Sequence, residues 1–272
     1  MQIRLYFLLF IAIVAVSSAS ILVVLASAPG IVSALWRLIF SLPIVFLLYR
    51  PKMSISNLKI PLIAGLSLSA HLSLWMESLF HASVAVSTAI VCTHSIFSGL
   101  FSAFYGEKPK ANHILGVSIA IIGVYLLSGA DYRADFLGIT FALLGAIFGG
   151  LYFSMGRIAR FEDFGSYISL TYLFATLFTF VNCIILKINI IYYPLKTWIC
   201  FFLLAIIPMM LGHTVLNYVL RYMHVVPVTA SVIGEVVGSA ILAVIFLNQI
   251  LTPLAYAYIA IVLLGILITF IH

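Results

Sequence analysis

The sequence carries very little charge. Only 7% of its 272 residues are Asp, Glu, Lys or Arg, whereas 65% are hydrophobic and the mean hydropathy is +1.28. A surface with so few charges cannot be solvated by water, so the composition excludes a soluble globular protein. We therefore predict an integral membrane protein whose main partner is the lipid bilayer.

Motifs for several kinds of chemistry are missing as well. The sequence has no GxxxxGK[ST] loop for ATP, no HExxH zinc motif and no reactive Ser or Cys beside a base. Its three cysteines lack CxxC spacing, so we interpret them as packing residues: Cys92, Cys183 and Cys200. The loop histidines are too scattered for metal ligation: His81, His113, His224 and His272. We expect no enzyme activity, no cofactor, no metal and no ATP-driven pumping.

Ten apolar runs of about 20 residues are present, and a helix of that length covers a hydrocarbon layer of about 30 Å. Barrel strands need only about 10 alternating residues, so run length favours helices over a barrel. We predict an all-α integral membrane fold with ten transmembrane helices, at residues 5–25, 33–49, 60–79, 84–105, 113–129, 137–157, 166–186, 198–220, 227–247 and 253–271.

The second half of the chain repeats the pattern of the first. Residues 71–129 align with residues 213–271 at an offset of 142 without a gap, which places His71 on His213. Only eight of the 59 pairs are identical, so the argument rests on the shared pattern; an offset of 134 relates the earlier helices. We interpret this as two five-helix repeats, residues 1–130 and 131–272. Because five is odd, the second repeat is inverted in the membrane, which is typical of secondary transporters.

The net charge of +6 is explained by the placement of the basic residues rather than by nucleic-acid binding. With a cytoplasmic N-terminus, nine basic residues fall in inner loops and three in outer loops. The inner set is Arg4, Arg50, Lys52, Lys59, Lys108, Lys110, Arg157, Arg160 and Arg221, and the outer set is Arg133, Lys187 and Lys196. This bias predicts a multi-pass protein of the cell membrane with both termini cytoplasmic and no nucleic-acid partner.

Four short stretches, in predicted helices or at their ends, can be compared with known motifs. They are Trp36-Arg37-Leu38, Tyr105-Gly106-Glu107-Lys108-Pro109, Tyr152 within Gly149 to Phe153, and Ser231 to Val236. Together they resemble the drug/metabolite transporter superfamily, specifically its EamA-type members, over nearly the whole chain. The resemblance implies a cavity lined by helices 1, 3, 4, 6, 8 and 9. It also implies export or exchange of small metabolites, often amino acids, without ATP.

Two residues depart from the pattern of that family. Gln249 stands where the second repeat would have its counterpart of Glu107. Val236 replaces the proline that many members have after Glu235, so we expect Glu235 to lie on an unbroken helix.

Four titratable side chains lie deep in the predicted helices: His71, His94, His213 and Glu235. A charge at mid-bilayer costs about 2.5–3.5 kcal/mol on insertion scales, so each of these residues needs a partner, a cavity or a function. Helical spacing puts Trp75 on the stripe of His71 and Asn217 on that of His213. The repeat places Thr93 rather than His94 opposite Glu235, so we expect His94 to point about 100° away.

These residues form the predicted substrate site, to which Ser17 and Tyr152 are added from helices 1 and 6. We hypothesise that Glu235 and His213 are a coupled titratable pair that links transport to protons. Three alternatives remain open: the histidines are neutral and hydrogen-bonded between helices, Glu235 is a protonated carboxyl bonded to a neighbouring helix, or Trp75 and Tyr152 only pack.

A second, shallower pair is predicted near the outer surface. Arg37 and Glu77 lie at matching depth, so an ion pair between them is our candidate for an outer gate. The alternative is that Arg37 snorkels and Glu77 is solvated. We expect Glu107 to cap a helix end near the inner surface.

The function best supported by the sequence is a secondary transporter, acting as a monomer or homodimer by alternating access. It would export or exchange a small polar metabolite, such as an amino acid or related amine, because no deep pair of Lys or Arg is present to hold phosphate. The alternative is a channel or receptor-like membrane protein, and less so an intramembrane enzyme.

Overall fold

The structure, a computed structural model, describes residues 2–52, 54–82, 84–128, 135–247 and 253–271. All regular elements in these ranges are helical. In chain order they are α1 (Gln2–Ser17), α2 (Ala19–Ala26), α3 (Gly30–Tyr49), α4 (Lys59–Ser78), α5 (Val84–Val91), α6 (His94–Ala103), α7 (Ala111–Ser128), α8 (Phe136–Ile158), η1 (Ala159–Phe161), α9 (Phe164–Ile185), α10 (Leu195–Leu204), the π-helical η2 (Ala205–Thr214), α11 (Val215–Val219), α12 (Val225–Ser231), α13 (Gly234–Leu247) and α14 (Pro253–Thr269).

Seven segments of the described chain are apolar and long enough to cross a membrane. They are Gln2–Ala26, Gly30–Tyr49, Val86–Ala103, Phe136–Phe161, Phe164–Ile185, Leu195–Val219 and Val225–Leu242. Helices α4, α7 and α14 occupy the three other ranges predicted from the sequence. The prediction of an all-helical membrane fold is therefore confirmed for the described residues.

Local chemistry sets several helix ends. Pro29 and Pro194 directly precede α3 and α10. A residue without an N–H loses no hydrogen bond there, because the N–H groups at the start of a helix have no partner within it. The Asp163 carboxylate accepts hydrogen bonds from the backbone N–H of Ser166 at 2.8 Å and from its hydroxyl at 2.7 Å, which caps α9. Those hydrogen bonds hold the pKa of Asp163 below its usual range.

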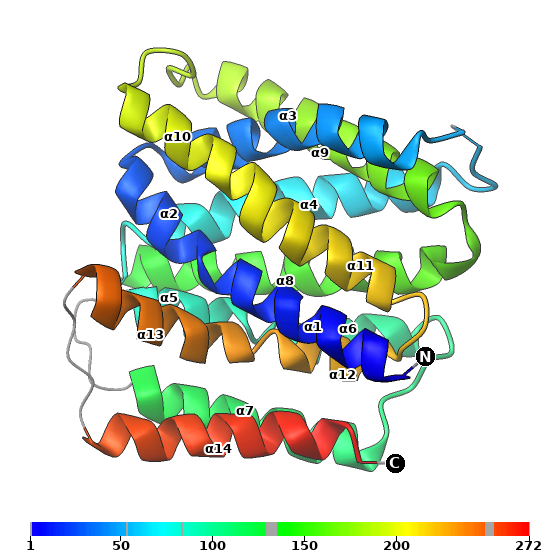
Figure 1. The fold of residues 1–272 in the computed structure, drawn as a ribbon, viewed down its shortest axis with the longest axis vertical. Helices are drawn as coiled ribbons and strands as arrows, with labels where there is room; N and C mark the ends of the chain where they lie inside the picture. Colours follow the sequence, from blue (N-terminus) through cyan, green and yellow to red (C-terminus); the bar gives the residue numbers. More distant parts are fainter. Residues whose placement is uncertain (1, 53, 83, 129–134, 248–252, 272) are drawn as a thin grey trace.

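The helices lie side by side along one direction, so that their ends form two opposite faces (Figure 1). Helix α4 packs against α8 and α9, and α3 packs against α9, in the body of the bundle. Helices α7 and α14 form a pair at its edge, where a Cβ on Gly116 would lie 2.6 Å from the Gly265 carbonyl oxygen. Helix α1 begins and α14 ends on the same face, which we call the terminal end.

Two of the helices that run through the centre are interrupted at matching places. Helix α5 gives way to α6 at Cys92–Thr93, and α12 gives way to α13 at Val232–Ile233. Backbone hydrogen bonds to the third preceding residue, as in a 3-10 helix, occur there. They run from Thr93 N to the Ile90 oxygen at 3.0 Å and from Glu235 N to the Val232 oxygen at 2.8 Å. The expectation that Glu235 lies on an unbroken helix is therefore wrong, because this turn needs no proline.

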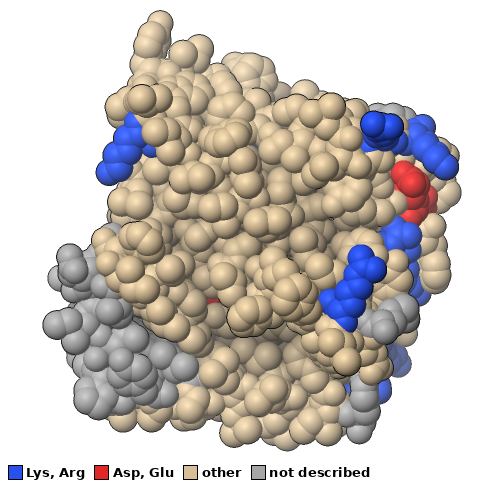
Figure 2. Space-filling view, viewed as in Figure 1, with Lys and Arg blue, Asp and Glu red and all other residues tan. Residues whose placement is uncertain are grey.

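Charged side chains gather at one end of the molecule. Figure 2 shows most of the visible Lys and Arg at the terminal end, whereas uncharged side chains, drawn in tan, cover most of the middle of the molecule on the side in view. That distribution is what the positive-inside bias predicts for a protein whose middle lies in lipid.

Candidate functional site

A small cavity lies at the centre of the bundle, at the level of the two helix interruptions. Each of the six predicted helices that the family resemblance assigns to a cavity contributes residues to its lining. The lining residues are Val16, Ala19, His71, Trp75, Val91, His94, Phe153, His213, Leu216, Val232 and Glu235. The cavity has room for about one water molecule. Five of the nine residues predicted to bind substrate meet here.

His71 is held in place by α8. Its Nδ1 donates a hydrogen bond to the Gly145 carbonyl oxygen at 2.8 Å, which leaves Nε2 as the acceptor of the neutral ring. A Cβ at Gly149 would lie 2.7 Å from Nδ1 of His71, so a glycine is needed for this close approach. The Trp75 ring is stacked on His71 with ring centroids 6.4 Å apart.

A hydrogen-bond network supports His213 from one side. The Asn217 Nδ2 group donates to the Tyr152 hydroxyl at 2.7 Å and to the His213 carbonyl oxygen at 2.9 Å. Phe153 stacks on the His213 ring, with centroids 5.8 Å apart and planes at 16°. Tyr152 and Asn217 thus position His213 rather than line the cavity in this structure.

Glu235 lies in the first turn of α13, where the partial positive charge of the helix N-terminus favours a carboxylate. Its side chain is buried, and Oε1 has no hydrogen-bond partner. His94 and His213 are also buried, and Nδ1 of each ring lacks a partner. Several buried polar atoms without a protein partner therefore surround the cavity.

His94 does not point away from this group, as the sequence predicted. Its ring lies 6.4 Å from that of His71 and 5.1 Å from that of Phe153, measured between centroids. The prediction was wrong because it continued an ideal helix through Cys92–Thr93, where the helix is interrupted.

Like Tyr152 and Asn217, the two remaining predicted contact residues lie outside the cavity. The Thr93 hydroxyl donates to the Ile90 carbonyl oxygen at 2.7 Å, within the interruption itself. Ser17 donates to the Ile13 carbonyl oxygen at 2.7 Å and lines an apolar groove of about 830 Å³ between α1, η2, α13 and α14.

The predicted outer pair, Arg37 and Glu77, is not formed in this structure. Glu77 Oε2 instead accepts from the Gly30 backbone N–H at 2.7 Å, which joins the end of α4 to the start of α3. Arg37 is fully buried, and its Nε donates to the Met209 sulfur at 3.3 Å.

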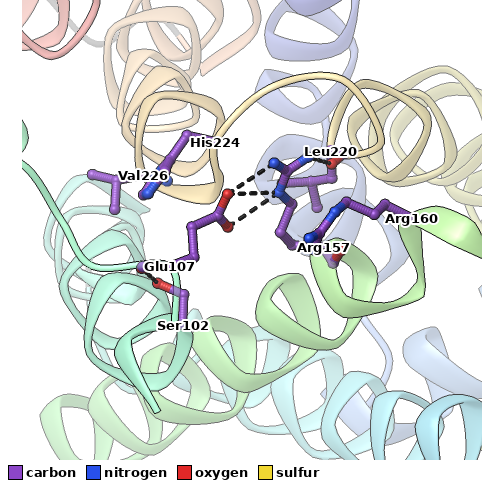
Figure 3. Close-up of polar contacts among 7 residues, drawn as sticks. All are labelled: Ser102, Glu107, Arg157, Arg160, Leu220, His224 and Val226. Carbon is purple, nitrogen blue, oxygen red and sulfur yellow. Dashed lines mark hydrogen bonds and ion pairs between the residues drawn. The ribbon is translucent and has the colours of Figure 1, made fainter. Parts of the chain in front are cut away.

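An ion pair that the sequence did not predict joins Glu107 to Arg157 (Figure 3). Arg157 Nε lies 2.9 Å and 3.1 Å from the two carboxylate oxygens of Glu107, and its NH2 lies 2.8 Å from Oε1. Arg157 NH1 also donates to the Leu220 carbonyl oxygen at 2.8 Å. One guanidinium thus joins the α6–α7 connection, the end of α8 and the end of α11. The Glu107 carboxylate therefore pairs with Arg157 and does not cap a helix.

A histidine pair lies beside this ion pair. The His113 and His224 rings are 4.7 Å apart, and His224 Nδ1 accepts from the Val226 N–H at 3.2 Å to cap α12. Burial lowers the pKa of His224, an effect that Glu107 opposes and Arg157 reinforces. Among the described residues no group of three or more His, Cys, Asp or Glu is arranged to hold a metal.

Comparison with known proteins identifies the family of the chain. The model of the EamA-like transporter family matches residues 3–129 and, a second time, residues 136–271. The chain belongs to the EamA-like transporter family. The resemblance seen in the sequence is thereby confirmed, and this EamA-like protein is a multi-pass membrane protein in contact with the lipid bilayer.

Two further similarities agree with the EamA-like assignment. An uncharacterized transporter of Clostridium kluyveri (strain ATCC 8527 / DSM 555 / NBRC 12016 / NCIMB 10680 / K1) is 26% identical over 111 residues. That match covers 38% of this chain and 35% of the relative, so the chain spans about a third of that protein's length. One solved crystal structure covers 99% of this chain and 98% of its own with a TM-score of 0.81 and 17% identity, which shows a shared fold.

Sequence reasoning missed two contributors to these sites. Phe153 is apolar and gave no polar signal, although it directly follows Tyr152. Arg157 was counted only as an inner basic residue, and the presence of Glu107 on the same predicted side was the available hint that the two could pair.

Proposed function

We propose that the protein is a secondary transporter that exports or exchanges a small polar metabolite by alternating access. An amino acid or a related amine is the substrate class that we favour. The observation that carries the proposal is the convergence of His71, His94, His213 and Glu235 on one small cavity inside an apolar bundle. Polar atoms with unused hydrogen-bonding capacity in the interior of a membrane protein are expensive, and transport of a polar solute is a reason to keep them.

The proposed architecture has ten spans in two inverted repeats, residues 1–130 and 131–272. Two family-model matches, one in each half, support it. The helix interruptions, at Cys92–Thr93 and Val232–Ile233, are 140 residues apart, close to the repeat offset of 142. Interrupted helices in corresponding halves are typical of transporters whose binding site lies near mid-membrane.

We assign the terminal end to the cytoplasm, which makes both termini cytoplasmic. The gathering of Lys and Arg at that end supports this orientation (Figure 2). In this orientation the Glu107–Arg157 ion pair closes the inner side, because it joins the first repeat to the second below the cavity. Opening toward the cytoplasm would require this ion pair to separate.

Proton coupling is assigned to Glu235 and His213, which line the same cavity. A histidine normally changes its charge between about pH 5 and pH 8 and is therefore suited to such a role. Transport by the Glu235→Gln protein should lose the pH dependence that the wild type has in this range. Equal pH profiles for the two proteins would remove Glu235 from the coupling mechanism.

Counterflow in proteoliposomes tests the proposed function. Vesicles loaded with unlabelled candidate substrate should take up the labelled compound transiently against its gradient, because an alternating-access carrier couples the two movements. Candidates are amino acids, polyamines and nucleosides, first screened by their effect on thermal stability. Flux that only equilibrates the label would indicate a channel instead.

A further inference from the structure

Arg37 is a cation enclosed by the helical bundle. It lies on α3 and has no exposed surface, and it is among the largest fully buried side chains of the described residues. A guanidinium remains charged in proteins, so Arg37 cannot escape the cost of burial by losing its proton. A buried charge of this kind needs compensation by an anion or by strong hydrogen bonds.

The observed partners of Arg37 provide little compensation. Its Nε donates to the Met209 sulfur at 3.3 Å, which is a weak acceptor. Its two terminal nitrogens, NH1 and NH2, have no hydrogen-bond partner. Within the described residues Arg37 forms no ion pair with Glu77 or with Glu235. The NH1–NH2 edge of the guanidinium, which can bind an oxyanion through two parallel hydrogen bonds, is therefore unused.

Arg37 nevertheless belongs to the surroundings of the central cavity. Its guanidinium is not part of the cavity lining, but it lies within electrostatic range of Glu235 and of the Tyr172 and Tyr152 hydroxyls. Met209, its contact on η2, is one helical turn before His213, which lines the cavity. The site therefore combines a cation with free donors and, in Glu235, a carboxyl whose Oε1 is free.

We propose that Arg37 is a substrate-binding residue that holds a carboxylate, while Glu235 faces a cationic group of the same molecule. This assignment rests on the proposed transport function. The two N–H groups of a guanidinium fork match a carboxylate in a bidentate geometry. The substrate class is thus narrowed from amino acids or amines to small zwitterions that carry a carboxylate.

Charge balance supports the same choice. Arg37 and Glu235 together are neutral when both are ionised, so a zwitterion enters the apolar interior without adding net charge. A simple amine would add a second cation and leave Arg37 without an anion. An isolated charge in a low-dielectric interior is far more costly than a paired one, which disfavours the amine.

The test uses purified full-length protein and a matched set of probes. Each standard amino acid is compared with its carboxamide and its decarboxylated amine by thermal shift. At least one amino acid should stabilise the wild type, and its carboxamide and amine should bind about tenfold or more weakly. This comparison needs no variant, so a folding defect cannot obscure it.

Variants then locate the effect at Arg37. Arg37→Gln should weaken binding of that amino acid by about tenfold or more, whereas Arg37→Lys, which keeps the charge but loses the fork, should weaken it less. Arg4→Gln removes a cation from the exposed start of α1 and should bind as the wild type does. Unliganded melting temperatures identify any variant that fails to fold.

Different outcomes separate the two proposals. Carboxamides or amines that bind as well as the amino acids, wild-type affinity in Arg37→Gln, or no stabilisation by any amino acid would each overturn the assignment of Arg37. Carboxylate-dependent binding without counterflow would support Arg37 and contradict the transport proposal. Counterflow of an amine that is unaffected by Arg37→Gln would support transport and overturn the role of Arg37.

Discussion

Glu107→Gln should make the interior of the bundle more accessible from the terminal end, which we assign to the cytoplasm. The substitution keeps the shape of the side chain but removes the charge that holds Arg157. The amide has one acceptor oxygen, whereas the carboxylate has two, which together make three contacts with the guanidinium. We expect the inner side to open more often as a result.

The size of the effect follows from the geometry. The contact is bidentate, and the Glu107 and Arg157 side chains are 20% and 16% exposed. Fully exposed ion pairs contribute about 0–1 kcal/mol, and hydrogen bonds to charged groups about 1.5–3 kcal/mol. For a pair between these limits we expect about 1–2 kcal/mol, which changes an open-to-closed ratio by about 5-fold to 30-fold.

Thiol labelling measures that ratio. Ser154 is fully buried and lines a second cavity, of about 240 Å³, which the Glu107 and Arg157 side chains also line, so Ser154→Cys reports separation of the ion pair. The native cysteines, Cys92, Cys183 and Cys200, are replaced by Ser, and a charged maleimide is added to inverted membrane vesicles. Glu107→Gln should raise the labelling rate by the factor given above.

Two controls decide whether the ion pair is the cause. Asp163→Asn removes an acid from the same end of the molecule while keeping an oxygen to cap α9, so its labelling rate should equal that of the parent. Exchanging the charges, with Glu107→Arg and Arg157→Glu together, should restore slow labelling in part, because the bond to the Leu220 carbonyl is lost. A Glu107→Gln protein that labels at the parental rate would refute the ion pair as the inner closure.

Two further predictions concern stability. Gly149→Ala should lower the melting temperature, because the new Cβ would lie 2.7 Å from His71 Nδ1 and overpacking costs about 1–3 kcal/mol. Gly145→Ala, whose Cβ would have its nearest atom at 3.3 Å, should lower the melting temperature less. Equal effects of the two substitutions would contradict the steric argument. Asp163→Ala should cost about 1 kcal/mol through loss of the α9 cap, and Asp163→Asn less. Because the folded-state pKa of Asp163 is lowered, the stabilisation by this cap is present above about pH 4 and is lost as the pH falls through the folded-state pKa. Thermal melts of the wild type and of Asp163→Ala at neutral and acidic pH measure this loss.

Much of the fold follows from run length and composition. A stretch of about 20 apolar residues can satisfy its backbone in lipid only as a helix, so the helical segments were predictable from the sequence. His71 and Trp75 were also predictable as neighbours, because both lie on the uninterrupted α4 and four residues make about one turn.

The remaining contacts depend on geometry that a single sequence does not contain. Glu107 and Arg157 are 50 residues apart, and their meeting requires the ends of α6 and α8 to lie at the same corner of the bundle. The turn at Val232–Ile233 arises from local backbone bonds without a proline, so composition gives no sign of it.

Depth and direction in a helix differ in how reliably they can be read. Counting residues along an apolar run gives depth, and a one-residue error shifts a side chain by only about 1.5 Å. The same error rotates it by about 100°, which is enough to move it from the cavity to the lipid. His94 shows the error in direction, because its orientation was taken from an ideal helix that is in fact interrupted. Arg37 and Glu77 show an error in depth. Glu77 contacts Gly30, which precedes Arg37 by seven residues on α3, or about 10 Å along the helix, so the two side chains do not lie at matching depth. A polar residue in a membrane helix therefore needs both a depth and a direction before a partner can be assigned to it.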